Sequence, residues 1–252
     1  WATHTYPANT QPVAAWTLLT TLTDFSCPGD IEVFIDEGSV RYLCETMQRK
    51  GFLDGKEMAS AFRLLRSNSL IWHYYVHGYL YGEQPGPFDV LYWNMDTTRM
   101  PAAMHSWYLR ELYLHNRLIV PDALTVAGSP IALDRIQAPL YAVGAEDDHI
   151  APWRQTFRIV NFARGPMRYV RSSSGHILGI INPVVSPPKR RYVAGDAHRS
   201  DSPEKWLARN GDTAGSWWPD WVHWLGARSG ELKTAPEQLG PVIYGDAPGT
   251  YV

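Results

Sequence analysis

The sequence has few cysteines, little net charge and no long apolar run. Its 252 residues include two cysteines, Cys27 and Cys44, which provide neither a disulfide framework nor metal-type spacing. The 23 basic and 25 acidic side chains nearly cancel, which argues against a nucleic-acid-binding protein. Nearly apolar stretches such as residues 12–19 are much shorter than the roughly 18 residues that cross a bilayer. We therefore expect a cytoplasmic protein without a transmembrane segment.

Tryptophan, in contrast, is abundant. The chain has 11, and part of them cluster in the segment GSWWPDW at residues 215–221, with Trp224 close behind. Hydrophobic residues make up 45% of the chain, which is enough for a large buried core. A usual domain has about 100 to 200 residues, so the length predicts one large domain or a domain with an additional part. We expect the tryptophan cluster to form a C-terminal helix that packs on a sheet.

The first half of the chain is predicted to be mainly helical. Residues 13–25 (VAAWTLLTTLTDF) indicate one buried strand that ends at a Cys-Pro-Gly-Asp breaker. Between about Glu32 and Arg117, apolar and aromatic residues recur at helical spacing, as in residues 62–80. Pro101 opens a second amphipathic pattern that includes Met104 and Trp107, and we expect this proline in the first turn of the helix.

The second half predicts a β–α–β unit. The apolar run 136–144 is typical of a buried parallel strand, residues 153–163 of a helix, and residues 167–171 of a second strand. Residues 183–201, which contain Pro187-Pro188-Lys189-Arg190-Arg191, predict a surface loop with a solvated basic run. The sequence thus indicates the α/β class.

Two side chains follow the predicted strands where an open α/β sheet places its functional groups. Asp148 comes after the first strand of the unit and His176 after the second. An isolated aspartate there is more often a turn former, and an isolated histidine is more often structural. The two together, in this order, correspond to the acid and the histidine of a nucleophile–acid–histidine triad in α/β-hydrolases. We therefore predict that Asp148 and His176 are catalytic.

The third member of such a triad is missing from the sequence. A nucleophile in this fold lies on a Gly-x-Ser/Cys-x-Gly turn, and no segment has that pattern. The flanks of Cys27, Cys44 and Ser129 do not fit it, so we interpret both cysteines as buried or linker thiols.

A metal site is the alternative that we weighed for the other polar clusters. His73 and His77 are four residues apart on a predicted helix, and Asp147, Asp148 and His149 are consecutive. Neither set has a convincing third ligand of a known pattern. We predict no metal.

Eight segments resemble the catalytic domain of polyhydroxyalkanoate synthases, in the same order. The resemblance extends from about Ala15 to the C-terminus and favours the single-subunit synthases, of the short-chain type. The segments are residues 19–25 (LTTLTDF), 33–38 (VFIDEG), 88–94 (FDVLYWN), 96–101 (DTTRMP), 107–110 (WYLR), 147–153 (DDHIAPW), 174–183 (SGHILGIINP) and 215–221 (GSWWPDW).

The resemblance implies an α/β-hydrolase fold with a partial core, a parallel sheet flanked by helices, and an inserted helical cap. Residues 1–28 would be a core strand segment, residues 29–117 the cap and residues 118–252 the C-terminal half of the core. The implied activity is an acyltransferase that polymerises 3-hydroxyacyl-CoA into polyester and releases CoA, without a cofactor. The implied partners are the polyester granule surface and, for a complete enzyme, a second copy in a homodimer.

The family's catalytic residues can be carried over in part. His176 matches the general base, Asp148 matches the catalytic acid, and His149 and Trp153 belong to the supporting loop. The resemblance leaves two roles open for Asp148, which either orients the His176 ring or activates the 3-hydroxyl group of the substrate. The turn that carries the family's nucleophilic cysteine should lie shortly before residue 15, but residues 1–10 show no likeness to the helix that follows this turn in the family. We expect a fragment of a longer synthase that is inactive alone. The alternatives are a chain that has lost its nucleophile, an esterase or thioesterase of the same fold, and a non-catalytic module that binds polyester or granules.

Overall fold

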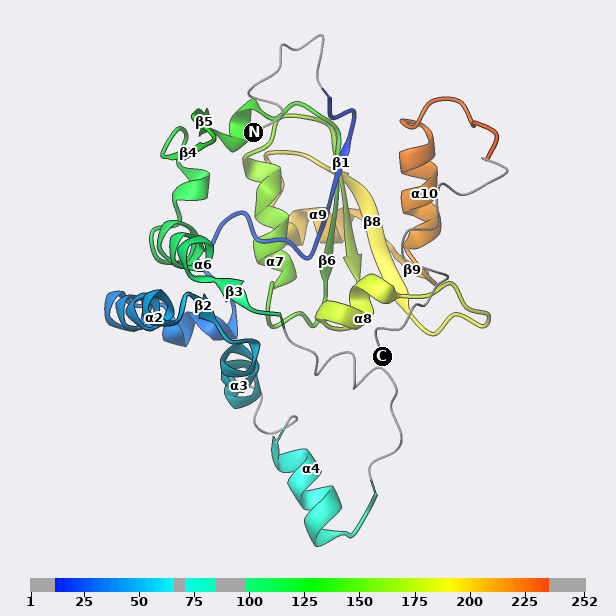
Figure 1. Ribbon diagram of the computed structural model, residues 1–252. Helices are drawn as coiled ribbons and strands as arrows, with labels where there is room; N and C mark the ends of the chain where they lie inside the picture. Colours follow the sequence, from blue (N-terminus) through cyan, green and yellow to red (C-terminus); the bar gives the residue numbers. More distant parts are fainter. Residues whose placement is uncertain (1–11, 66–70, 85–97, 236–252) are drawn as a thin grey trace.

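A computed structural model describes residues 12–65, 71–84 and 98–235 of the chain (Figure 1). Its centre is a five-stranded mixed sheet with the strand order β1-β6-β7-β8-β9. The pairs β1–β6 and β6–β7 are parallel, and β8 and β9 are added antiparallel. The strands are β1 (Trp16–Leu19), β6 (Leu140–Ala145), β7 (Met167–Ser172), β8 (Arg191–Ala197) and β9 (Asp212–Ala214).

Strand β6, between β1 and β7, is the fully buried strand of this sheet. All six of its residues are buried, as the continuous apolar run predicted. Successive side chains point to opposite faces. Leu140 and Ala142 therefore contact one hydrophobic cluster, around Phe157 and Trp206, while Tyr141 and Val143 contact another. Helices cover both faces, which makes the fold α/β.

Two of the helical regions around the sheet occupy the predicted places. The β–α–β unit is confirmed, because α7 and η8 connect the parallel strands β6 and β7. The predicted C-terminal helix is also confirmed, with Trp217 and Trp224 buried against Tyr141, Val143 and Val170. These helices are α7 (Trp153–Thr156), the 3₁₀ helix η8 (Phe157–Asn161), α8 (His176–Ile181), α9 (Pro203–Arg209) and α10 (Trp218–Gly226).

Between β1 and β6 the chain forms a mainly helical part with a hydrophobic cluster of its own. Val40, Cys44, Met47 and Leu109 are among its buried members. The elements are η2 (Asp30–Phe34), α2 (Glu37–Lys50), β2 (Phe52–Leu53), α3 (Gly55–Leu65), α4 (His73–Tyr75), η4 (Val76–Leu80), β3 (Met100–Pro101), α6 (Ala102–Tyr108), η5 (Leu109–Leu114), η6 (Arg117–Ile119), β4 (Leu124–Val126), β5 (Ser129–Ile131) and η7 (Leu133–Arg135).

The longest of these helices, α2, has clear signals at both ends. The side chain of Asp36 accepts hydrogen bonds from the main-chain nitrogens of Gly38 and Ser39, at 2.8 and 3.0 Å. Such an N-cap satisfies donors that have no partner inside the helix. At the other end Gly51 adopts a left-handed conformation with φ of 84°, where a residue with a side chain would be strained.

Several predictions from the sequence were wrong in detail. Residues 183–201 are not only a loop, because β8 pairs with β7 across six residues. The strand predicted at 13–25 is reduced to β1, which is half-buried. Pro101 precedes α6 as its N-cap, and Met104 and Trp107 are exposed. Residues 88–97 lie outside the described part of the chain, so the motif at 88–94 is not placed, and of the motif at 96–101 only residues 98–101 are, which include β3.

Candidate active site

Asp148 and His176 lie next to each other, as their positions after two strands predicted. Asp148 follows β6 and His176 is the first residue of α8, just after β7. Because β6 and β7 are parallel neighbours, their carboxyl ends lie at the same edge of the sheet. The His176 Nδ1 atom is 2.8 Å from the Asp148 Oδ2 atom, although the two residues are 28 positions apart.

The carboxylate of Asp148 has partners on both oxygens. Its side chain is fully buried, and Oδ1 accepts hydrogen bonds from the main-chain nitrogens of Ile150 and Ala151, both at 2.8 Å. Asp148 is therefore a turn former and a histidine partner at the same time. An ionised carboxylate only accepts hydrogen bonds, so the His176 Nδ1 carries the proton of that bond.

This arrangement leaves the other ring nitrogen of His176 available. With Nδ1 protonated, Nε2 of the neutral imidazole is an acceptor. The His176 side chain is 32% exposed, so its ring is accessible from outside. A histidine held by a carboxylate with its free nitrogen accessible can act as a general base.

Main-chain hydrogen bonds join the two loops that carry the pair. The nitrogen of Asp147 donates to the Ser174 carbonyl at 3.0 Å, and that of Glu146 donates to the Ser172 carbonyl at 2.8 Å. Ser174 itself has a φ of 79°, an uncommon value for a residue with a side chain. The ladder of β6 and β7 thus continues into the loops and sets the distance between Asp148 and His176.

The supporting residues His149 and Trp153 have structural contacts. The His149 carbonyl accepts a hydrogen bond from the Asp30 nitrogen at 3.4 Å, which connects the loop to η2. Trp153 is buried in the hydrophobic cluster around Phe157 and Trp206. The Arg154 and Arg171 guanidinium groups lie over its ring. Both residues shape the loop after β6.

The basic run that was predicted to be solvated contributes to the same loops. Arg191 begins β8 and forms ion pairs with Glu146 at 3.0 Å and Asp212 at 3.3 Å. The hydrogen bond to Glu146 raises the pKa of the Arg191 guanidinium above its usual value. Arg190 donates to the hydroxyl of Ser174. Lys189 and Arg191 are exposed, as the prediction of a solvated run had it, while the partners of Arg190 and Arg191 could not be predicted because they are distant in sequence.

Gln155 is a further residue of this region that the sequence did not single out. Its side-chain nitrogen donates to the Asp24 carbonyl at 3.0 Å and to the Ser26 hydroxyl at 2.9 Å. The segment after β1 is therefore attached to the helix that follows the Asp148 loop. Nothing in a lone glutamine predicts such partners.

The two cysteines are free thiols in different surroundings. Cys44 is buried in α2, and Cys27 is exposed in the loop before η2.

Of the histidines considered as metal ligands, His77 pairs with Glu83 through Nδ1 at 2.5 Å. Within residues 12–65, 71–84 and 98–235, no three His, Cys, Asp or Glu side chains are grouped as a metal site. In the same residues, no helix has the length and apolar character to cross a membrane.

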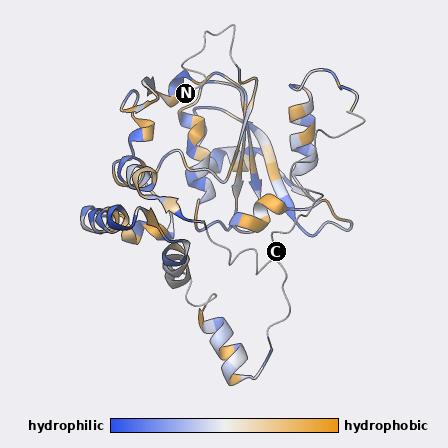
Figure 2. Cartoon of the chain, viewed as in Figure 1, coloured by the Kyte–Doolittle hydropathy of each residue, from blue (hydrophilic) through white to orange (hydrophobic). Residues whose placement is uncertain are grey.

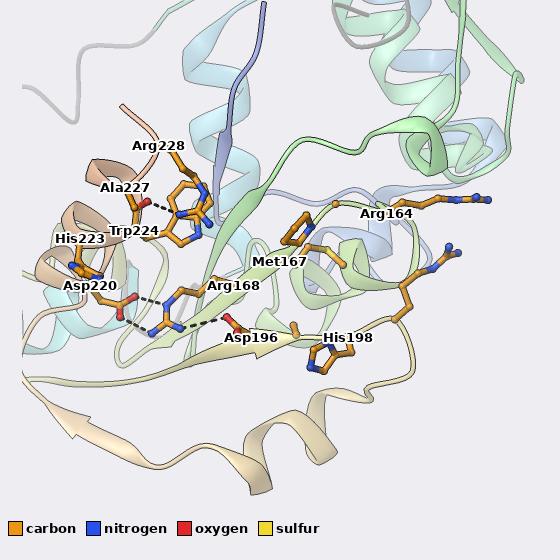
Figure 3. Close-up of a pocket in the computed structure, with 14 residues that line it drawn as sticks. Arg164, Met167, Arg168, Asp196, His198, Asp220, His223, Trp224, Ala227 and Arg228 are labelled. Atoms are coloured by element: carbon orange, nitrogen blue, oxygen red, sulfur yellow. Dashed lines mark hydrogen bonds and ion pairs between the residues drawn. The ribbon is translucent and has the colours of Figure 1, made fainter. Parts of the chain in front are cut away.

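A groove of 840 Å³ lies elsewhere, at the start of β7 (Figure 3). Figure 3 shows Arg168 of β7 pointing toward Asp220 of α10 and Asp196 of β8. The two bonds from Arg168 to Asp220 are 2.8 and 2.6 Å long, and Tyr141 donates to the same carboxylate at 2.8 Å. This groove contains neither Asp148 nor His176, and its ion pairs hold α10 on the sheet.

Asp220 has a shifted pKa as a result of these contacts. Partial burial raises the pKa of its carboxyl, but the hydrogen bonds from Arg168 and Tyr141 outweigh this, so the pKa lies below the usual value. Burial also raises the pKa of the Tyr141 hydroxyl, and the negative charge of Asp220 adds to that effect. The Tyr141 hydroxyl therefore keeps the proton that it donates, and the Asp220 carboxylate stays ionised and accepts it.

Comparison with known proteins gives relatives of one kind. No protein-family profile matches the chain. The chain is 43% identical over 250 residues to the poly(3-hydroxyalkanoate) polymerase subunit PhaC of Cupriavidus necator, and 43% identical over 243 residues to that of Rhizobium meliloti. It is 42% identical over 243 residues to poly(3-hydroxyalkanoate) polymerase 1 of Ectopseudomonas oleovorans. These matches cover 95 to 96% of the chain and 39 to 43% of the relatives. The chain thus spans about two fifths of their length.

Proposed function

The chain is a relative of the poly(3-hydroxyalkanoate) polymerases that matches their C-terminal part, and from this relationship we propose that it supplies the base and the acid of such an enzyme. The enzyme would join 3-hydroxyacyl groups from their CoA thioesters into polyester and release CoA. The observation that carries the proposal is the Asp148–His176 pair, whose Nε2 is accessible and free to take a proton.

His176 would serve two proton transfers. In the first, its Nε2 takes the proton of a cysteine thiol that this chain does not contain. The thiolate attacks the thioester carbonyl, and the CoA thiolate leaves and takes up the proton from His176. In the second, His176 takes the proton of a 3-hydroxyl group, whose oxygen attacks the carbonyl of the enzyme-bound acyl thioester. The new ester bond forms as the C–S bond breaks, and the cysteine thiolate that leaves takes up the proton from His176. Asp148 stabilises the imidazolium in both steps, and it matters more in the second, because a hydroxyl is far less acidic than a thiol and its activation through His176 depends on the carboxylate.

The finer description of the fold belongs to the same proposal. We propose an α/β-hydrolase fold, supported by the parallel strands β1, β6 and β7 and by the chain order of acid before histidine. In this division residues 1–28 are a core segment, residues 29–117 the cap and residues 118–252 the rest of the core. The separate hydrophobic cluster around Met47 supports the cap as a packed unit.

The partners follow from the same reaction. The substrate is 3-hydroxyacyl-CoA, the products are polyester and CoA, and no cofactor takes part. We propose that the complete enzyme is a cytoplasmic homodimer at the surface of polyester granules. Exposed aromatic side chains of the helical part, such as Trp72, Tyr75 and Tyr79, support contact with an apolar material. The preference for short-chain monomers remains a prediction.

A chimera tests the proposal. The part of the Cupriavidus necator polymerase that precedes the matched region is joined to this chain, and the product is given 3-hydroxybutyryl-CoA. We expect CoA release together with insoluble polyester, and neither from this chain alone, because it has the base without the nucleophile. The same chimera with His176→Ala is the matched control and should be inactive.

The products separate the alternatives. CoA release with free 3-hydroxybutyrate in place of polyester would indicate a thioesterase. Turnover by the isolated chain would contradict the assignment of the nucleophile to another part of the enzyme. A folded chimera that leaves the substrate intact would contradict the proposed function as a whole.

A further inference from the structure

Helix α8, which begins with His176, has little side-chain burial to hold it. It is six residues long, and among its side chains Ile177, Leu178 and Ile181 are each about half exposed. Figure 2 shows that this helix is mainly hydrophobic, so polar contacts on its surface do not compensate for its small buried area. A helix this short is not stable by itself in water, since nucleation costs more than a few hydrogen bonds return. Its position must be set by other contacts.

One of these contacts is a close approach to the sheet. Gly179 is buried, and a Cβ atom on it would lie 2.6 Å from the Cβ of Ala145 at the end of β6. The backbone of α8 therefore packs directly on the last residue of β6, just before the loop that carries Asp148. This contact fixes the height of α8 above the sheet.

Two indole groups fix its carboxyl end. The last four carbonyls of a helix have no partner inside it. In α8, the Leu178 carbonyl accepts from the Asn182 nitrogen at 3.0 Å. The Gly179 carbonyl accepts from Trp217 Nε1 at 2.9 Å, and the Ile180 and Ile181 carbonyls accept from Trp218 Nε1 at 3.1 and 3.0 Å. All four carbonyls are satisfied, three of them by tryptophan.

The two tryptophans are themselves held on the sheet. Trp217 is fully buried, and the Trp217 and Trp218 rings are stacked with their centroids 4.2 Å apart. The helix that they begin is attached by Asp220 to Arg168 and Tyr141, as Figure 3 shows for Arg168. Trp221 Nε1 also donates to the Thr17 hydroxyl of β1 at 3.0 Å.

We propose that Trp217 and Trp218 are positioning residues for His176. They connect the far end of α8 to the sheet, so that the imidazole at its near end stays within hydrogen-bond distance of Asp148. The inference rests on the proposed function for its catalytic meaning, while the positioning itself concerns only this chain. The aromatic cluster then has a role in the active site without touching the substrate.

The test replaces the indole N–H and keeps an aromatic ring. Trp217→Phe and Trp218→Phe remove the bonds to α8. Trp206→Phe is the matched control, because Trp206 is also fully buried and its Nε1 also donates to a main-chain carbonyl, that of Gly195, at 3.3 Å. Trp206 lies in the other hydrophobic cluster, away from α8. The loss of stability should therefore be similar in Trp217→Phe and Trp206→Phe.

Two measurements on the isolated chain report the position of α8. Hydrogen exchange of residues 173–182 should be about tenfold faster in Trp217→Phe, the ratio expected for one lost hydrogen bond, and unchanged in Trp206→Phe. Correlation of the His176 ring nitrogens with their carbon-bound protons should show one tautomer, protonated at Nδ1, in the starting protein and in Trp206→Phe. In Trp217→Phe and Trp218→Phe it should show a mixture of tautomers.

The active chimera adds a third measurement. There, Trp217→Phe should lower kcat about tenfold with KM unchanged, because a positioning role affects the proton transfer by His176 and not the binding of the thioester. If both tryptophan variants keep the single His176 tautomer and the exchange rates of residues 173–182, the positioning role is wrong, whatever the chimera does. If these signals change while no chimera is active, the positioning stands and the proposed function fails. If Trp217→Phe does not fold, Trp218→Phe, at a half-buried ring, decides the question.

Discussion

His176 Nδ1 lies 2.8 Å from Asp148 Oδ2, and the second oxygen of the same carboxylate is held by two main-chain N–H groups of the loop after β6. The carboxylate therefore cannot rotate away from the imidazole without breaking the turn that it stabilises. Loop conformation and histidine orientation depend on one side chain. This connection determines what a substitution at either position should do.

Substitution at Asp148 should separate the two proton transfers. In the chimera, we expect His176→Ala to lower enzyme acylation by about 10²- to 10⁴-fold, the range for loss of a general base. Asp148→Asn can keep the bonds from Ile150 and Ala151 through its carbonyl oxygen, so it should fold and mainly slow elongation. Single-turnover acylation and steady-state polymer formation measure the two steps.

Asp147→Asn is the matched control for this comparison, because Asp147 is the exposed carboxylate one residue earlier. It should behave like the starting enzyme in both steps. An equal loss of acylation and elongation in Asp148→Asn would indicate that the carboxylate only orients the ring.

A glycine in α8 offers a test of the close packing on β6. In Gly179→Ala the new Cβ would lie 2.6 Å from that of Ala145, so α8 must shift, and we expect a loss of about 1–3 kcal/mol in the free energy of unfolding. Gly226→Ala is the control, since nothing lies within 4 Å of the added atom there. It should be neutral or more stable by about 0.5–1 kcal/mol. Urea denaturation of both variants measures the difference.

The contacts of Asp220 predict that the stability of the folded protein decreases at acid pH. Its pKa is lower in the folded protein than in the unfolded chain, so its stabilising contribution is present above the unfolded value, near 3.8, and is lost as the pH falls through the folded value. Asp220→Asn should cost about 1–3 kcal/mol at pH 7, the range for a charged hydrogen bond. The cost should shrink below about pH 4. Denaturation curves at pH 7 and pH 3.5 check this, and an equal cost at both would contradict it.

The burial of His105 predicts that stability also depends on pH closer to neutrality. Burial lowers the pKa of this imidazole from 6.5, because the charged form is poorly solvated in the helical part. Its neutral form is therefore favoured by folding, and stability should decrease as the pH falls below about 6.5. His105→Phe keeps a ring next to Tyr108 and should reduce this decrease between pH 7 and 5.5. Thermal denaturation at these two values measures it, and an identical pH response in both proteins would exclude His105 as its source.

The sequence predicted best what depends on neighbouring residues. The run from Leu140 to Ala145 is apolar throughout, so its burial on both faces could be expected, and the positions of Asp148 and His176 followed from the strands before them. The strand β8 was missed because it has small residues at buried positions, Gly195 and Ala197, and follows a proline-rich segment. Its alternating burial becomes visible only when β7 is beside it.

Helical spacing predicted helices correctly but not which face is covered. Residues 73–80 are helical, yet Tyr74, Tyr75 and Tyr79 are exposed, since periodicity does not reveal whether a partner surface exists. The bonds from Trp217 and Trp218 could not be predicted either, because their acceptors are main-chain carbonyls, which every residue has. The tryptophan cluster predicted that α10 packs on the sheet, but it did not predict that Trp217 and Trp218 also hold α8.

The hydrogen bond between Trp221 and Thr17 has a consequence for how the protein is made. It joins residues 204 positions apart, and in the part of the chain that the structure describes β1 pairs with β6 alone, 124 positions later at Trp16 and Leu140. On the ribosome, these contacts of β1 can therefore form only after the chain as far as Trp221 has emerged. Contacts this distant are formed slowly, and an unpaired strand edge invites aggregation in the meantime. The helical part, whose contacts are more local, can be complete by then.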